Sequence, residues 1–129
     1  MMNKLIVGMK GKAAVNWTEI RKEARAVLQK LHIDIDVNRL VGSLSLAQKQ
    51  MVLIARAVQG ECNFLILDEP TAPLSTAETE RLFQMVEHLR KTEDIAIVFI
   101  SHRLQEVKHI CNSITIMRNG KVVENGPLN

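Results

Sequence analysis

Two short apolar runs separated by a helical pattern constrain the fold of this chain more than any other feature. Phe64 to Leu67 and Ile95 to Ile100 are continuous apolar segments of strand length, and such runs are typical of strands covered on both faces. Between them, Ser75 and Glu78 have the spacing of a capping box that opens a helix. Because buried strands that alternate with helices pair in parallel through right-handed crossovers, the pattern predicts an α/β fold.

Two helical patterns precede the first strand. Apolar residues recur at helical spacing from Thr18 to Leu31, with Thr18 as the expected N-cap and Trp17 as a hydrophobic staple. A second helix is expected to start near Leu46 and to end before Gly60. Because no strand separates these two helices, we expect them to form a separate helical layer.

A short helix and a β-hairpin are expected after the second strand. The helix contains Leu104 to Ile110, and the hairpin pairs Ile114 to Met117 with Lys121 to Val123 across Asn119-Gly120. Asn-Gly is the preferred sequence of a two-residue turn in which both central residues have positive φ. The predicted order is therefore helix, helix, strand, helix, strand, helix and hairpin.

Composition excludes several functional classes. With 129 residues, 47% hydrophobic and 24% charged, the chain is typical of one soluble globular domain. No apolar run approaches the about 20 residues of a membrane helix or resembles a signal peptide. Aromatic residues make up 3% and Tyr is absent, so we expect no base-stacking surface for nucleic acid. Cys62 and Cys111 stand alone, without metal-ligand spacing, as thiols of a reducing cytosol.

Acidic residues follow the first strand directly. Asp68 at a strand tip can hold a hydrated Mg²⁺ that neutralises nucleotide phosphates, and Glu69 can orient a water and accept its proton. Two acidic residues at an ordinary exit from a strand are also common, and that alternative stays open for this pair taken alone.

His102 follows the second strand, at the same predicted edge of the sheet. A histidine there can donate a hydrogen bond to the γ-phosphate of a nucleotide and sense its loss. A loop or capping role is the alternative for an isolated histidine. Ligands bind at the carboxyl ends of strands in such sheets, so finding His102 beside Asp68 and Glu69 favours a nucleotide site.

A third candidate, Ser45, precedes the second helix. Free backbone N–H groups and the helix dipole make such a helix start an anion site, and the Ser45 hydroxyl adds a donor. Local evidence taken alone favours Ser45 as an N-cap over a ligand-binding residue. The two roles are compatible, because a capping residue can also present itself to a ligand.

These segments, taken in order, resemble the ABC ATPase family. LSLAQ at 44–48 looks like its signature motif, FLILDEPT at 64–71 its Walker B segment, APLS at 72–75 its D-loop and ISHR at 100–103 its H-loop. The motifs are most similar to those of the first nucleotide-binding domain in monosaccharide importers.

The resemblance runs from Trp17 to Val123 and implies a partial P-loop NTPase core with parallel strands. A helical subdomain with the signature motif would occupy about residues 1–60. The C-terminal half of the catalytic core, ending in a β-hairpin, would occupy about residues 61–129.

The resemblance also implies site residues, cofactors and partners. Asp68 would position Mg²⁺ through water, Glu69 would be the general base and His102 the γ-phosphate switch, while Ser45 and Gln48 would contact ATP held by a partner domain. The partners implied are a second nucleotide-binding domain, transmembrane permease subunits and, indirectly, a periplasmic sugar-binding protein. The location implied is cytoplasmic, on the inner face of the cell membrane.

Some positions depart from the family pattern. Leu46 and Ala47 replace the signature glycines, which limits backbone approach to a phosphate. Ser75 stands where the D-loop usually has aspartate, and contact with nucleotide and helix capping both stay open as its role. Gly8 to Ala13 has two residues between its glycines instead of four and lacks the hydroxyl of a P-loop, so we reject it as one. We therefore expect the P-loop to lie upstream and the chain alone to be inactive.

Two other functions stay open. A non-transport ABC ATPase of DNA repair or translation would need a long insertion or coiled coil near the signature motif, and none is visible. A degenerate remnant would dock to a partner nucleotide-binding domain through Ser45 and its helix without hydrolysing ATP. The sequence does not identify a sugar, since other subunits select it in such importers.

Overall fold

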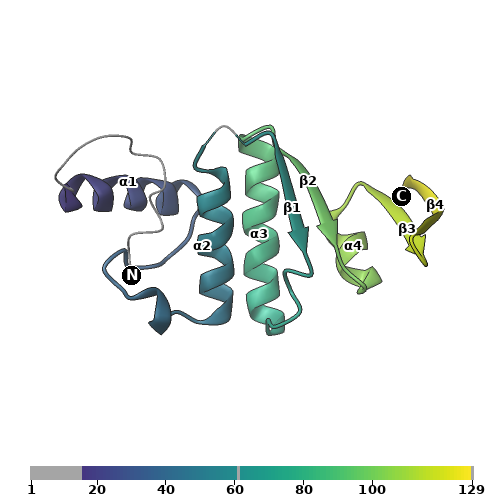
Figure 1. Cartoon of the computed structure of the whole chain (residues 1–129), viewed down its shortest axis with the longest axis horizontal. Coiled ribbons are helices and arrows are strands. Elements are labelled where there is room, and N and C mark those ends of the chain that lie inside the picture. The colour runs from purple at the N-terminus through teal and green to yellow at the C-terminus, as the bar shows by residue number, and fades with distance from the viewer. Residues whose placement is uncertain (1–15, 61, 129) are drawn as a thin grey trace.

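The computed structural model describes residues 16–60 and 62–128. The rejected P-loop segment, Gly8 to Ala13, lies outside these residues. The elements follow the predicted order (Figure 1). They are α1 (Trp17–Lys30), the 3₁₀ turn η2 (Val41–Ser43), α2 (Leu46–Val58), β1 (Phe64–Asp68), α3 (Thr76–Thr92), β2 (Ala96–Ile100), α4 (Leu104–Ile110), β3 (Ser113–Arg118) and β4 (Lys121–Pro127).

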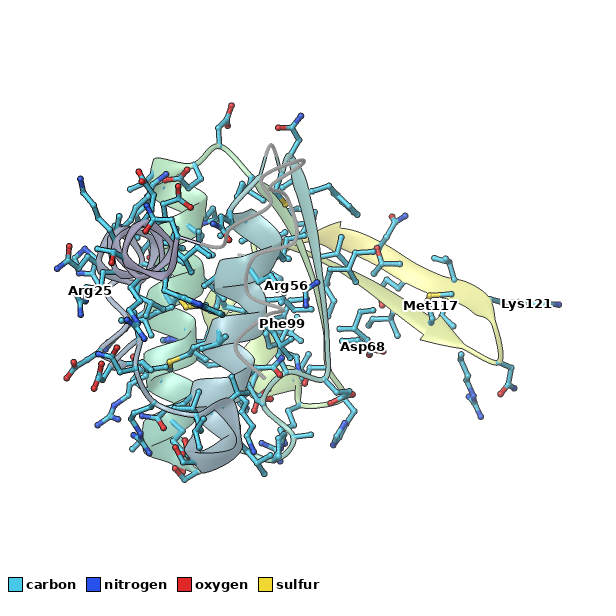
Figure 2. The ribbon with its side chains drawn as sticks, turned by 60° about the vertical axis from the view of Figure 1, so that its left-hand side comes forward. Arg25, Arg56, Asp68, Phe99, Met117 and Lys121 are labelled. Atoms are coloured by element: carbon cyan, nitrogen blue, oxygen red, sulfur yellow. The ribbon has the colours of Figure 1, made fainter. Side chains whose placement is uncertain are left out.

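β1 and β2 form a parallel two-stranded sheet, which confirms the α/β prediction. Phe64 pairs with Ala96 and Asp68 with Ile100, so the two strands start and end together. α3 makes the crossover between them. Figures 1 and 2 show α2 and α3 on the same side of this sheet.

One continuous core joins the helices to the sheet. It contains Leu82 and Leu89 of α3, which are fully buried, Leu65 and Leu67 of β1, and residues of α1 and α2 such as Leu28, Ile54 and Ala55. The two leading helices therefore share one core with α3 and the sheet, and their assignment to a separate helical layer stays a prediction. Among the described helices, none has the length and apolar character that crossing a bilayer requires.

The prediction that both faces of the strands are covered is wrong. Phe64 is 56% exposed, Ile66 58%, Val98 41% and Ile100 46%. The alternate residues of both strands point toward α2 and α3, while no described element lies over the opposite face. A continuous apolar run indicates that both faces of a strand are hydrophobic, but it does not indicate which element covers each face. We call these four side chains the exposed sheet face.

α1 begins one residue earlier than its expected cap. Asn16 is the N-cap, and its Oδ1 accepts the backbone N–H of Glu19 at 3.3 Å. Thr18 therefore lies inside the helix, and Trp17 is its first residue, 39% exposed. The predicted cap at Thr18 and staple at Trp17 are both wrong, because Asn16 is the stronger capping residue of the two and stands directly before the helix.

The hairpin is confirmed. β3 and β4 are antiparallel, and Arg118 pairs with Lys121 across the two-residue turn. Asn119 and Gly120 have φ of +51° and +73°, which is the backbone that an Asn-Gly turn prefers. Figures 1 and 2 show the hairpin projecting from the rest of the molecule, and its side chains on both faces, such as Ile116 and Met117, are exposed.

We expect the exposed sheet face to drive self-association, because contiguous apolar surface and unpaired strand edges recruit a partner. Replacing Ile66 and Val98 together by Ser should shift the chain from large assemblies toward a monomer, as measured by light scattering at equal concentration. The matched control is Leu65→Ser on the buried face, which should cost about 2–5 kcal/mol of stability without improving solubility. A wild-type chain that is monomeric and unfolds in one sharp transition would contradict this expectation.

Candidate functional site

The parallel register of β1 and β2 brings two polar segments to one edge of the sheet. Asp68 ends β1 opposite Ile100 at the end of β2, and the N–H of Glu69 continues the ladder by donating to the Ile100 carbonyl at 2.9 Å. Glu69 and His102 therefore leave the sheet side by side, as predicted. Figure 1 shows the N-termini of α2 and α3 at this same end of the molecule.

A carboxylate–imidazole pair forms at this edge. Oε1 of Glu69 accepts the backbone N–H of His102 at 3.1 Å and lies 2.9 Å from His102 Nδ1. Because an ionised carboxylate only accepts hydrogen bonds, Nδ1 donates in this contact, and Nε2 is left for another partner. The side chain of His102 is 72% exposed, so the imidazole is open to a ligand.

Glu69 combines two unusual features. Its φ of +45° lies in the left-handed region that residues other than glycine rarely adopt. Its second carboxylate oxygen, Oε2, is buried and has no hydrogen-bond partner among the described residues. An unpaired buried oxygen is unfavourable, so this atom is suited to accept a proton or a hydrogen bond from a bound molecule. Strained backbone of this kind concentrates at functional sites.

Asp68 is the candidate metal residue. It is exposed at the tip of β1, and Figure 2 shows it on the side of the sheet away from α2 and α3, whereas Phe99 lies on the helix side. Within residues 16–60 and 62–128, no three His, Cys, Asp or Glu side chains form a cluster that could hold a metal ion. Magnesium ions usually keep several waters and take one or two carboxylates with phosphate oxygens, so the exposed Asp68 carboxylate fits a hydrated ion.

Ser45 and Gln48 form a complete capping box at the start of α2. The Ser45 Oγ accepts the N–H of Gln48 at 3.2 Å, and the Gln48 Oε1 accepts the N–H of Ser45 at 3.0 Å. Both residues also line a cleft of about 730 Å³ with Arg81 and His88 of α3. The structure does not bring this pair into contact with Glu69 or His102, although both groups lie at the same end of the molecule (Figure 1).

Ser75 is the N-cap of α3. Its Oγ and backbone N–H both donate to Glu78 Oε2, at 2.8 and 3.0 Å. The backbone N–H of Ser75, followed by its hydroxyl, lowers the pKa of the Glu78 carboxyl. The capping interpretation of Ser75 is therefore confirmed, and its contact with nucleotide stays a prediction.

A second carboxylate, Glu106, connects the two strand exits and was missed by the sequence analysis. Its Oε2 accepts the hydroxyl of Thr71 at 2.6 Å and that of Ser101 at 3.2 Å, while its Oε1 accepts Arg103 Nη1 at 3.0 Å. Burial by itself raises the pKa of Glu106, but the hydrogen bonds from Thr71, Arg103 and Ser101 outweigh burial and hold this pKa below its ordinary value. No local pattern marks Glu106, because Thr71 lies 35 positions away in the chain.

The sequence matches one protein-family model, described as ABC transporter, over residues 2–72, which is more than half of the chain. It is 39% identical over 115 residues to the ribose import ATP-binding protein of Caldanaerobacter subterraneus, covering 89% of this chain and 23% of the relative. It is 42% identical over 113 residues to the ribose import ATP-binding protein of Corynebacterium glutamicum, covering 88% and 21%. The chain spans about a fifth of the length of these curated relatives.

Solved structures are similar as well. An inward-facing conformation of a putative metal-chelate type ABC transporter superimposes with a TM-score of 0.77 at 27% identity, covering 92% of this chain and 47% of that one. The ATP-binding cassette MJ0796, in a dimeric post-hydrolysis state bound to ADP and Pi, superimposes with a TM-score of 0.75 at 25% identity, covering 97% and 53%. The likeness therefore extends over nearly all of this chain and about half of each solved one.

Replacing Glu106 by Gln should destabilise the chain at neutral pH by about 1.5–3 kcal/mol, because hydrogen bonds to an ionised carboxylate are lost. A carboxyl whose pKa is lowered by folding stabilises the folded state above its unfolded pKa, and this contribution disappears as pH falls through the lower folded pKa. The difference between wild type and variant should therefore shrink below about pH 4.

Urea denaturation at pH 7 and pH 3 measures this effect, in the Ile66→Ser/Val98→Ser background to limit self-association. Glu87→Gln is the matched control, because Glu87 is an exposed carboxylate of α3 paired with Arg90 and Lys91. It should change stability little at either pH. An equal loss for Glu106→Gln at both pH values would argue against a contribution from the ionised carboxylate.

Proposed function

This chain belongs to the ABC transporter family of ATP-binding proteins, and we propose that it forms part of the ATPase that powers an importer for a simple sugar. The observation that carries the proposal is the contact between Glu69 and His102 at the carboxyl ends of parallel strands. The choice of sugar import is supported by similarity to two relatives named as ribose import ATP-binding proteins. ATP and Mg²⁺ are the cofactors that this role requires.

Glu69 is proposed as the general base of ATP hydrolysis. Its Oε2 has no partner among the described residues, and this buried oxygen, once reached by a bound water molecule, would orient that water and take its proton. Its Oε1 is held by the N–H and imidazole of His102, so the two oxygens have different environments. Positioning and electrostatic stabilisation dominate phosphoryl transfer, and a carboxylate fixed on one side is suited to that task.

His102 is proposed as the residue that responds to the γ-phosphate. While Nδ1 donates to Glu69, Nε2 can donate to a phosphate oxygen only if the ring is protonated on both nitrogens. A phosphate oxygen on the side of the ring away from Glu69 would accept such a hydrogen bond. Loss of the phosphate would remove this acceptor, which gives the residue its switching property.

Asp68, Ser45, Gln48 and Ser75 complete the proposed site. Asp68 would hold Mg²⁺ through water, and the bound ion would neutralise phosphate charge. Ser45 and Gln48, at the N-terminus of α2, would contact ATP bound by a partner domain, since helix N-termini favour anions. Ser75 at the start of α3 would contact the nucleotide from the D-loop position.

The partners proposed are a second nucleotide-binding domain and membrane permease subunits, with a periplasmic sugar-binding protein acting indirectly. This arrangement implies a cytoplasmic location at the inner face of the membrane. We propose that residues 1–60 form the helical part with the signature motif and that residues 61–129 form the C-terminal half of the catalytic core. No nucleic-acid partner is proposed.

ATP turnover tests the proposal. The sequence contains no Gly, four residues, then Gly-Lys-Ser/Thr, so we expect the isolated chain to be inactive with ATP and Mg²⁺. Joining it to the P-loop-bearing segment of a ribose import relative should create activity. In that joined protein, Glu69→Gln and His102→Ala should each lower kcat by at least about 100-fold, with nucleotide binding retained. Glu87→Gln, on the outer face of α3, should leave turnover unchanged.

The other outcomes distinguish the alternatives. Turnover by the isolated chain would overturn the rejection of Gly8 to Ala13 as a P-loop. Absence of turnover in both proteins would favour a remnant that only docks to a partner nucleotide-binding domain. Full activity of the Glu69→Gln protein would remove that residue from the mechanism.

A further inference from the structure

We propose that Glu106 is a positioning residue, which holds the exits of β1 and β2 together and thereby maintains the Glu69–His102 contact. The relevance of this role to hydrolysis rests on the proposed function. The geometric role itself is independent of nucleotide, because it concerns contacts within the chain.

A single oxygen of Glu106 reaches both strand exits. Oε2 accepts the Thr71 hydroxyl at 2.6 Å and the Ser101 hydroxyl at 3.2 Å. Thr71 stands two residues after Glu69, and Ser101 stands immediately before His102. The carboxylate therefore bridges the two segments that carry the proposed catalytic pair, which are otherwise joined there by the Glu69 N–H to Ile100 bond and by the pair itself.

The other oxygen of Glu106 fixes the turn that presents His102. Oε1 accepts Arg103 Nη1 at 3.0 Å, and the Arg103 backbone N–H donates to Ser101 Oγ at 3.0 Å. The Ser101 hydroxyl thus donates to Glu106 and accepts from Arg103. His102, between these two residues, has its backbone held on both sides while its ring stays exposed.

The Thr71–Glu106 end of this network is buried, whereas the Arg103 side chain is exposed. Thr71 is completely buried, and the Glu106 side chain is 11% exposed. Glu106 lies in the first turn of α4, next to Val107, which is buried in the core. A buried polar network in which each group has a partner specifies one arrangement, because every alternative leaves a group unsatisfied.

The hydrogen-bond partners of Glu106 differ from those of a typical carboxylate in the first turn of a helix. A carboxylate at this position usually reaches back to the N-cap backbone N–H, as Glu78 does in α3. Glu106 instead accepts side-chain donors from Thr71, Ser101 and Arg103. Such an arrangement stabilises two loops rather than its own helix. The positive φ of Glu69 requires this kind of support, since strained backbone persists only where its surroundings hold it.

Amide hydrogen exchange of the full chain tests the proposal without nucleotide. The N–H of His102 donates to Glu69 Oε1, so its exchange rate reports the pair directly. In Glu106→Gln, exchange at His102, resolved to single residues by fragmentation in mass spectrometry, should accelerate roughly tenfold or more. Exchange at Val98, in the middle of β2, should accelerate much less.

A matched pair of variants at Thr71 keeps the test decisive if Glu106→Gln folds poorly. Thr71→Val removes the hydroxyl while keeping the buried volume, and should accelerate exchange at His102. Thr71→Ser keeps the hydroxyl and should preserve slow exchange. Glu87→Gln is the charge-matched control outside the network and should change neither amide.

Two results would overturn the proposal. Unchanged exchange at His102 in Glu106→Gln and in Thr71→Val would show that the network does not maintain the pair. Equal acceleration at His102 and Val98 would assign Glu106 to general stability alone. A third result separates the two proposals. If exchange accelerates at His102 but not at Val98, and the P-loop-joined protein does not hydrolyse ATP, the positioning role is supported and only the proposed function is rejected.

Discussion

The in-register parallel pairing of β1 and β2 is the constraint on which the rest of the molecule depends. Because Asp68 lies opposite Ile100, each residue that follows one strand has a counterpart that follows the other. A shift by one residue would exchange the faces of β1 and place Asp68 toward the core. The register therefore determines the buried face and the Glu69–His102 contact together, so core packing and the candidate site are consequences of the same hydrogen-bond ladder.

The N-termini of α2 and α3 add a second layer to this end of the molecule. Both helices open with capping boxes, at Ser45 and Ser75, and these ends lie beside the strand exits (Figure 1). Helix N-termini carry partial positive charge, whereas the exits carry Asp68, Glu69 and Glu106. The end of the molecule thus offers both anion-attracting and cation-attracting groups, as a site for a metal-bound phosphate needs.

Local sequence predicted the elements well and the tertiary contacts unevenly. The capping boxes and the Asn119-Gly120 turn were predictable because the interactions that form them span only a few residues. The adjacency of Glu69 and His102 followed from the parallel fold alone. The apolar runs taken alone predicted covered strand faces, because such a run does not specify which element covers it. The Glu106 network was not predicted either, since its partner Thr71 is 35 residues away in the chain and none of the partners is unusual in isolation.

The connectivity of the strands also has a consequence for the order of folding. β3 and β4 are joined by a two-residue turn, so their pairing closes a very short loop. The pairing of Phe64 with Ala96 closes a loop that includes the whole of α3. Pairing of distant segments loses loop-closure entropy before any stabilising contact forms, so it is intrinsically slower. The hairpin can therefore form early, while the carboxylate and imidazole meet only when the crossover helix has docked. The chemistry of this chain is thus acquired at a late stage of folding.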